Sequence, residues 1–310
     1  MKKGIFLLLI LMGACSLDQA SKQSSVTTTD LKSDYKKTYI GYDKKSDAMT
    51  SLPKEIAEAV IVINGLERRY LWSEPNDSSG LAPVIIAFHG YGGLAQDFLI
   101  TTQLYEAARS AGFYLVYPQG AILASEGFSH WNAGLPSANN KSNIDDFSFF
   151  ITLVERLTSL YPIDPNRIFL VGYSNGGFLA YALACFYSEK VNAIAAISSS
   201  MLDETYQECK PSNKVGIFSL QGAKDSTIAI SGSEGVKSFN NVIDFWFTIN
   251  GGERIEKTQL DGDLIFTQFN QDNATLSEHY EVRSAGHEWI TLDLNGESTA
   301  ELILSYFKQR

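Results

Sequence analysis

A serine set between glycines is the position in this sequence best suited to nucleophilic chemistry. Gly172-Tyr173-Ser174-Asn175-Gly176-Gly177 follows an apolar segment and precedes a helical pattern. A G-x-S-x-G pattern in this context is typical of a nucleophile elbow, a strained turn that lifts the serine hydroxyl above the edge of a sheet. The helix that follows points its positive end at the same place. We predict that Ser174 is a nucleophile; the alternative is a glycine-rich turn with an inert serine.

A serine nucleophile needs a base, because its hydroxyl reacts poorly at neutral pH. In hydrolases with a nucleophile elbow, an acid and then a histidine follow the serine along the chain. Of the four histidines in the sequence, only His279 and His287 follow Ser174. His279 lies inside a strand pattern and is interpreted as structural. His287 lies in the loop after that strand and is the predicted base.

The acid that orients this base is expected after another apolar strand. Asp225 lies in the loop that follows the strand pattern Val215–Leu220, so we predict that it holds His287 and stabilises its imidazolium. Asp203 and Glu204 follow the preceding strand and are the weaker candidates.

Two backbone N–H groups are expected to stabilise the oxyanion of a tetrahedral intermediate. One belongs to Asn175, the residue after the nucleophile, and the other is assigned to Tyr91 in the glycine-rich segment His89–Gly93. His89 itself is interpreted as a residue that packs this loop.

Alternating strand and helix patterns surround these positions and predict a mostly parallel central sheet with helices on both faces. Asn64-Gly65 is a strong turn signal between the first two strands. The predicted strands are Val60–Ile63, Arg69–Trp72, Val84–Phe88, Phe113–Tyr117, Arg167–Gly172, Ala193–Ser198, Val215–Leu220, Ile255–Leu260, Leu264–Phe269 and Glu278–Val282. The predicted helices are Ala95–Ala111, Asp146–Tyr161 with Asp145 as N-cap, Asn175–Ser188, Gly235–Ile249 and Thr299–Phe307.

A long polar loop at 118–143 follows a predicted strand and is expected near Ser174, at the carboxyl edge of the sheet. Trp131 is its most prominent aromatic residue. We predict that Trp131 is the chief aromatic contact to the substrate and Trp289 a second one, because an indole offers a large apolar face and one N–H donor. The alternative is that both tryptophans fix their loops against the core.

The first residues have the composition of an export signal. Lys2 and Lys3 precede an apolar run, Ile5–Met12, which is too short to span a bilayer. Leu-Met-Gly-Ala-Cys resembles the lipobox of bacterial lipoproteins, which implies lipidation of Cys15, a membrane anchor and, for a Gram-negative source, the outer membrane or cell surface. The alternative is an ordinary secretory signal. Residues 1–14 are thus the predicted signal peptide, 15–50 a flexible tether, and 51–310 one catalytic domain.

The net charge of -10 argues against a nucleic-acid partner, because phosphates would repel such a surface. The acidity is otherwise interpreted as a contribution to solubility.

Several segments together resemble one family. The segments that carry the resemblance are HGYGG (89–93), YPQG (117–120), the run from IDDF to ALAC (144–185), QGAKD (221–225) and GHEW (286–289). In these segments the sequence resembles polyhydroxybutyrate depolymerase-like esterases, which are related to feruloyl and acetyl-xylan esterases. The resemblance covers about residues 60–308. It implies an α/β-hydrolase fold and ester hydrolysis without metal or cofactor, by a triad of Ser174, Asp225 and His287.

The sequence departs from this family in the loops that shape the pocket. Gln221 stands where the family often has histidine, Ile290 where it often has proline, and a proline is missing near Thr227–Ile230. The resemblance therefore leaves the ester open among hydroxyalkanoate, feruloyl or acetyl polysaccharide and short-chain esters. A serine peptidase of the same fold and a non-catalytic binding protein on a hydrolase scaffold are the alternative functions.

Cys185 and Cys209 are the cysteines of the predicted domain. An exported chain folds in an oxidising compartment, and the family resemblance supports a disulfide between them. The alternative is two buried free thiols.

Overall fold

The computed structural model describes residues 52–310 except 78, 137–139, 252, 260–261 and 272–273. These residues all belong to one unit of the chain, Lys44–Arg310. The predicted signal peptide, Cys15 and the tether lie outside the described residues. Within the described part, no helix combines the length and apolar character needed to cross a membrane.

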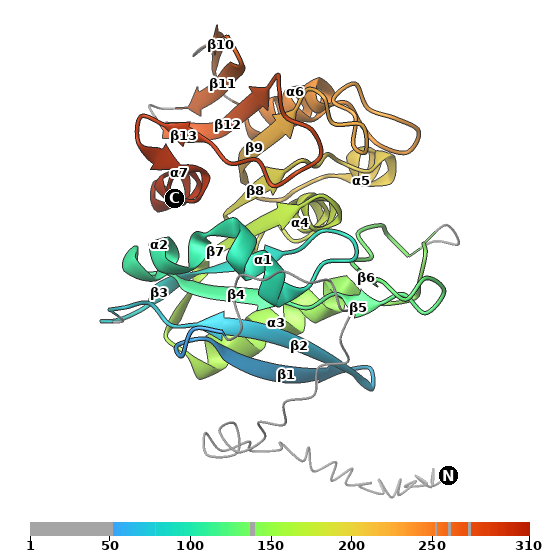
Figure 1. The fold of residues 1–310 in the computed structure, drawn as a ribbon, viewed down its shortest axis with the longest axis vertical. Coiled ribbons are helices and arrows are strands. Elements are labelled where there is room, and N and C mark those ends of the chain that lie inside the picture. Colours follow the sequence, from blue (N-terminus) through green and yellow to red (C-terminus); the bar gives the residue numbers. More distant parts are fainter. Residues whose placement is uncertain (1–51, 78, 137–139, 252, 260–261, 272–273) are drawn as a thin grey trace, which may run out of the picture. The chain divides into compact units, whose positions relative to one another are not determined.

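A ten-stranded sheet forms the centre of the described region (Figure 1). The six neighbouring strands from β4 to β12 run parallel, and antiparallel strands extend the sheet at both ends, which confirms the predicted mostly parallel sheet. In spatial order the strands are β1 (Ala57–Ile63), β2 (Leu66–Ser73), β4 (Tyr114–Pro118), β3 (Ala82–Phe88), β7 (Ile163–Tyr173), β8 (Ala193–Ile197), β9 (Gly216–Gly222), β12 (Ala274–Val282), β11 (Leu264–Gln271) and β10 (Glu253–Gln259).

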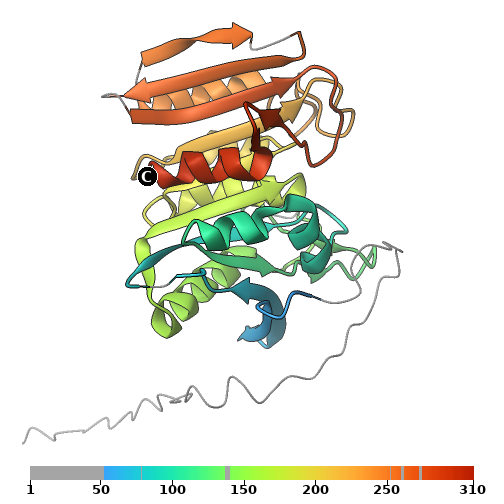
Figure 2. The same ribbon diagram turned by 60° about the vertical axis from the view of Figure 1, so that its left-hand side comes forward.

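Helices cover both faces of this sheet (Figure 2). Successive side chains of a strand belong alternately to two apolar clusters, because neighbouring side chains point to opposite faces of the sheet. Val84, Ile86 and Phe88 of β3 pack with the first cluster, and Ile85 and Ala87 with the second. The first cluster holds α3 (Asp146–Leu160), α4 (Asn175–Phe186) and α6 (Phe239–Asn250), and the second holds α1 (Ala95–Thr102), α2 (Leu104–Ser110) and α7 (Thr299–Lys308).

The turn predicted at Asn64-Gly65 is confirmed, with φ of 52° and 80° at these two residues. The prediction of a single helix over residues 95–111 is wrong. Gln103 takes a left-handed conformation, φ 54° and ψ 16°, and separates α1 from α2. The Thr102 hydroxyl bonds the carbonyl of Leu99 and accepts from the N–H of Leu104, so a side chain takes over backbone bonding at this point.

Another boundary differs from its prediction because a side chain caps the helix. The helix expected from Gly235 begins at Phe239, where Ser238 is the N-cap and accepts from the N–H of Asn241 at 3.2 Å. The short elements α5 (Asp203–Glu208), β5 (Ala121–Ile122), β6 (Ser129–His130), β13 (Asp293–Leu294) and β14 (Glu297–Ser298) were not predicted; β5 and β6 pair within the long 118–143 loop.

The predicted disulfide is confirmed: Cys185 near the end of α4 is bonded to Cys209, directly after α5. Both residues are buried in the first apolar cluster. Such a bond is typical of proteins that fold in an oxidising compartment.

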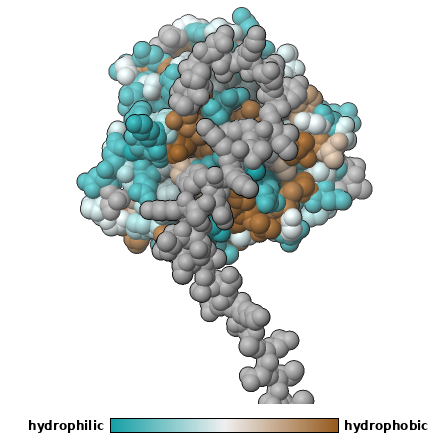
Figure 3. Space-filling view, turned by 60° about the horizontal axis from the view of Figure 1, so that its bottom comes forward, coloured by the Kyte–Doolittle hydropathy of each residue, from teal (hydrophilic) through white to brown (hydrophobic). Residues whose placement is uncertain are grey.

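Hydrophobic residues also reach the surface in places. On the face shown in Figure 3 they form separate patches among hydrophilic residues. Among the described residues, exposed large hydrophobic side chains include Val60, Val62 and Leu66 of the β1–β2 hairpin.

Candidate active site

Ser174 lies at the turn between β7 and α4, in a backbone conformation that residues with a side chain rarely adopt. Its φ is 51° and its ψ is -118°. Neighbouring groups hold this strained geometry: the Ser174 N–H donates to the carbonyl of Ile197 at 3.1 Å, and the Ser174 carbonyl accepts from the Ser199 hydroxyl at 2.8 Å. The local geometry of a nucleophile elbow is therefore present.

Glycine at position 176 allows α4 to begin directly against β3. A Cβ atom at Gly176 would lie 2.2 Å from the carbonyl oxygen of Phe88, which is backbone and cannot move aside. A side chain here would push the first turn of α4 away from the end of β3. The close approach brings the segment after β3 beside Ser174.

Ser174, His287 and Asp225 form a continuous hydrogen-bonded chain. His287 Nε2 lies 2.9 Å from Ser174 Oγ, and His287 Nδ1 lies 2.8 Å from Asp225 Oδ2. Because a carboxylate can only accept, Nδ1 carries the proton and Nε2 is free to accept from the serine hydroxyl. The structure thus brings together the three side chains that the sequence singled out.

The buried carboxylate of Asp225 is held by more than the histidine. Its Oδ1 accepts from the N–H groups of Thr227 and Ile228, both at 2.8 Å. Its Oδ2 also accepts from Nε2 of Gln221 at 3.2 Å. These donors fix the plane of the carboxylate and stabilise its negative charge.

The loops that carry Asp225 and His287 lie against one another. The N–H of Lys224 donates to the carbonyl of Ala285 at 2.9 Å, and a Cβ at Gly222 would lie 2.5 Å from the same oxygen. The Tyr173 hydroxyl donates to the His287 carbonyl at 3.2 Å. The spacing between acid and base is therefore set by backbone contacts as well as by their own hydrogen bond.

The two predicted oxyanion donors lie at neighbouring strand ends. Within the described part of the chain, neither the Tyr91 N–H nor the Asn175 N–H donates to a protein acceptor. Tyr91 follows β3 and Asn175 follows β7, and these strands are neighbours. The chain leaves β3 toward β4 on one side and β7 toward β8 on the other. Such a topological switch point is where open parallel sheets bind ligands.

The side chain of Tyr91 is occupied elsewhere. Its hydroxyl donates to the carboxylate of Glu126, which raises the pKa of Tyr91 to about 12, and its ring lies against Phe128. The side chain is well exposed, so only the backbone of Tyr91 is placed for the oxyanion role.

The prediction that Trp131 contacts the substrate is wrong. Its side chain is 2% exposed, its ring is stacked on Phe149, and its indole N–H donates to the carbonyl of His89 at 2.8 Å. The alternative of a loop-fixing residue fits these contacts. Trp289 is partly buried and lies near Phe98 and Tyr173, so its substrate contact stays a prediction.

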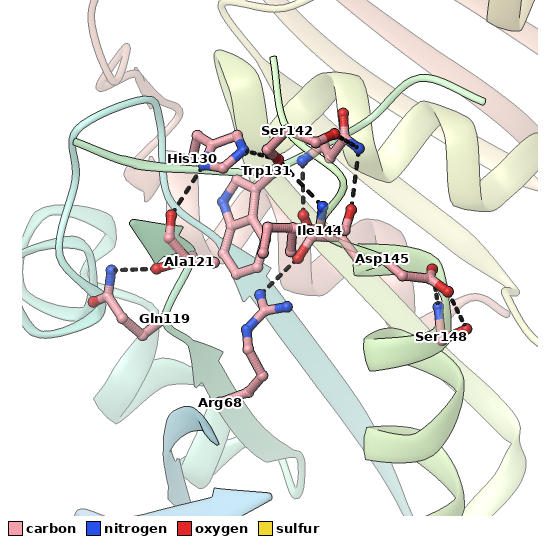
Figure 4. Close-up of polar contacts among 12 residues, drawn as sticks. Arg68, Gln119, Ala121, His130, Trp131, Ser142, Ile144, Asp145 and Ser148 are labelled. Atoms are coloured by element: carbon pink, nitrogen blue, oxygen red, sulfur yellow. Dashed lines mark hydrogen bonds and ion pairs between the residues drawn. The ribbon is translucent and has the colours of Figure 1, made fainter. Parts of the chain in front are cut away.

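The other histidines have structural partners. His279 is buried and bonds the Ser219 hydroxyl through Nδ1 at 2.6 Å. His130 bonds the carbonyl of Ala121 and the hydroxyl of Ser142 (Figure 4). Within the described residues, no group of histidine, cysteine, aspartate and glutamate side chains is arranged to hold a metal ion.

His89 was predicted to pack its loop, and its contacts show how. The ring is buried, Nδ1 donates to the carbonyl of Gly90 at 2.7 Å, and Nε2 accepts from the N–H of Gly120 at 2.9 Å. Burial lowers the pKa of His89 to about 4. The ring is therefore neutral at pH 7, as these two bonds require.

The sequence reasoning missed the contribution of Gln221 and of the Asn175 side chain. Gln221 was noted only as a departure from a family pattern, and Asn175 only for its backbone N–H. The sequence signals that could have indicated these roles were the proximity of Gln221 to the acid Asp225 and of Asn175 to the nucleophile Ser174 along the chain.

A strained serine after a parallel strand, with its histidine and aspartate on loops at the same edge, is the arrangement of the α/β-hydrolase fold. A solved acetyl xylan esterase from Aspergillus awamori is similar in fold, with a TM-score of 0.60 at 12% identity, over 82% of this chain and 100% of that one. The chain belongs to the Esterase family, whose model, described as "Putative esterase", matches residues 68–300.

Curated relatives are similar over part of their length. "Putative esterase NocK" from Nocardia uniformis subsp. tsuyamanensis is 27% identical over 169 residues, 53% of this chain and 47% of that protein. Feruloyl esterase B from Piromyces equi is 26% identical over 153 residues, 49% of this chain and 27% of that protein. The matches thus cover less than half the length of these relatives.

Proposed function

We propose that this protein is a serine esterase that hydrolyses carboxylic esters through an acyl-enzyme on Ser174. The observation that carries the proposal is the continuous hydrogen-bonded chain from Ser174 through His287 to Asp225. Membership of the Esterase family supports the same reaction.

The geometry supports a two-step mechanism. His287 Nε2 takes the proton of the Ser174 hydroxyl as Oγ attacks the ester carbonyl, and the N–H groups of Tyr91 and Asn175 stabilise the oxyanion. The imidazolium then gives this proton to the departing alcohol. Water then attacks the acyl-enzyme with His287 again as base, the bond between Ser174 Oγ and the acyl carbon breaks, and the imidazolium returns the proton to Oγ as the acid leaves. Asp225 holds the imidazole in the required tautomer throughout.

The proposed substrates are esters linked to plant polysaccharide, with feruloyl or acetyl groups, ahead of hydroxyalkanoate and simple short-chain esters. The relative named feruloyl esterase B supports this order.

Replacement of the nucleophile tests the proposal. The wild type is expected to hydrolyse p-nitrophenyl acetate and methyl ferulate and to react with a fluorophosphonate probe, whereas Ser174→Ala should do neither while keeping its circular dichroism spectrum. A peptide anilide serves as the amide control. Near-normal ester turnover by Ser174→Ala would refute the assignment of the nucleophile. Faster turnover of the anilide than of either ester would point to a peptidase instead.

We also propose that the protein is exported and anchored through a lipid on Cys15. The disulfide between Cys185 and Cys209 and the lipobox-like sequence before Cys15 support this location. In a bacterial host, Cys15→Ser should move the protein from the membrane fraction to the soluble fraction or block its processing. Unchanged fractionation and processing would favour an ordinary secretory signal.

A further inference from the structure

Trp131 is hydrogen-bonded to both segments that carry the proposed oxyanion donors. Its indole N–H donates to the carbonyl of His89, in the segment after β3. Its backbone bonds the side chain of Asn175, at the start of α4. We infer that Trp131 is a positioning residue that fixes both N–H donors of the oxyanion hole, an inference that rests on the proposed esterase function.

The β3 side of the hole is fixed through two successive peptide groups. Trp131 holds the His89 carbonyl at 2.8 Å. The Gly90 carbonyl accepts from His89 Nδ1 at 2.7 Å and from the Gly93 N–H at 3.0 Å. The described peptide bonds are all trans, so the Tyr91 N–H points away from the held Gly90 carbonyl. The direction of this donor therefore depends on the groups that hold the two carbonyls before it.

The α4 side is fixed by a paired contact. Oδ1 of Asn175 accepts from the Trp131 N–H at 2.7 Å, and Nδ2 of Asn175 donates to the Trp131 carbonyl at 3.0 Å. Both ends of one amide are thus bonded to the backbone of one residue, which restrains rotation of Asn175. The N–H of Asn175 is the second proposed donor, so the same tryptophan restrains both sides.

A buried ion pair lies near Trp131, and its arginine, Arg68, is labelled in Figure 4. The N–H of Asn132 donates to Oδ2 of Asp146 at 2.7 Å, and Oδ1 of Asp146 is 2.6 Å from Nη2 of Arg68. The Arg68 guanidinium lies 4.0 Å from the ring centre of Phe149, on which Trp131 is stacked. The tryptophan is therefore held on its backbone, its ring face and its indole N–H.

Because Trp131 is buried, its loss should reduce stabilisation of the transition state rather than the affinity for substrate. The oxyanion forms only during reaction, so donors that are misdirected lower kcat and leave KM nearly unchanged. Removing one oxyanion donor typically costs about 10²–10³ in kcat. Trp131→Phe keeps both donors and the backbone contacts to Asn175, and loses only the hydrogen bond to the His89 carbonyl, so we expect kcat to fall by about 10–100-fold.

Trp246→Phe is the matched control. Trp246 is a fully buried indole in the same apolar cluster, on α6, and its Nε1 has no hydrogen-bond partner among the residues that the structure describes. This substitution removes the same atoms without breaking a hydrogen bond, and we expect kcat within about twofold of the wild type.

The experiment measures kcat, KM and the inhibition constant of an alkyl trifluoromethyl ketone, whose adduct with Ser174 places an oxyanion in the hole. In Trp131→Phe, affinity for the ketone should fall by the same factor as kcat/KM, with KM within about threefold and the acid-side midpoint of the kcat/KM pH profile unchanged. Asn175→Ala, which keeps its N–H but loses the paired contact, should act in the same direction. It carries the test if Trp131→Phe does not fold.

The outcomes separate the inference from the function on which it rests. No ester turnover by the wild type refutes the proposed function. An active wild type whose Trp131→Phe and Asn175→Ala variants keep normal kcat refutes the inference alone. Equal losses in Trp131→Phe and Trp246→Phe would show a packing role and overturn it as well.

Discussion

Replacing Arg68 with methionine should destabilise the protein far more than replacing its neighbour Arg69. The Arg68 side chain is 3% exposed and bonds the Asp146 carboxylate, which is fully buried, at 2.6 Å. Its removal leaves a buried negative charge without its cation, which typically costs about 3–5 kcal/mol. We expect a loss in the free energy of unfolding of this size, because methionine replaces the apolar stem but not the charge.

Arg69→Met is the matched control on the same strand. The Arg69 side chain is 39% exposed and lies 3.4 Å from Glu58, itself partly exposed. Exposed ion pairs contribute about 0–1 kcal/mol, since water and salt screen both charges. The two substitutions therefore remove the same chemical group from sites that differ in burial and partner.

Urea denaturation of both variants, followed by fluorescence, measures these losses. Burial raises the pKa of Asp146 while Arg68 opposes this effect, so loss of Arg68 raises it further. A carboxyl whose pKa is higher in the folded state destabilises the fold at high pH and less so at low pH. The Arg68→Met deficit should therefore be smaller at pH 5 than at pH 8. Equal losses in the two variants, or a deficit that grows as the pH falls, would refute the reasoning.

Further outcomes are expected at three other places. Asp225→Asn should lower kcat by about 10³–10⁴, because an amide N–H facing His287 favours the wrong imidazole tautomer; steady-state kinetics with p-nitrophenyl acetate measure this. Since burial lowers the pKa of His89 from 6.5 to about 4, the contribution of this histidine to the free energy of unfolding is present above pH 6.5 and should decrease by about 3 kcal/mol as the pH falls to 4. The melting temperature of His89→Gln should show a shallower decline across that range than the wild type. Replacing Cys185 and Cys209 together by alanine should cost about 3 kcal/mol in urea denaturation, with activity retained in native buffer.

The succession of strands and helices along the chain and the three side chains that the structure brings together could be predicted from the sequence, since both depend on local signals. Val84–Phe88 is apolar at every position, as a strand buried on both faces must be, and the glycines around Ser174 mark a tight turn. The break at Gln103 could not be predicted, because it depends on the hydroxyl of Thr102 and its contact with Tyr117 from another element. Trp131 was misassigned because loop length indicates position but not which way a side chain turns. Its indole N–H is held by the His89 carbonyl and its backbone N–H by the Asn175 side chain, and these partners lie 42 and 44 residues away along the chain.

The distribution of the site over the ends of β3, β7, β9 and β12 links activity to the last stage of folding. Ser174 and His287 are 113 residues apart, and the strand before the histidine pairs with β9 only after the chain has returned from the β10–β11 hairpin. Contacts between residues this distant form late, because closing long loops costs entropy first. Recovery of ester turnover after dilution from denaturant would therefore follow the closure of the sheet at β12. A partly folded chain that lacks this strand has a nucleophile without a base.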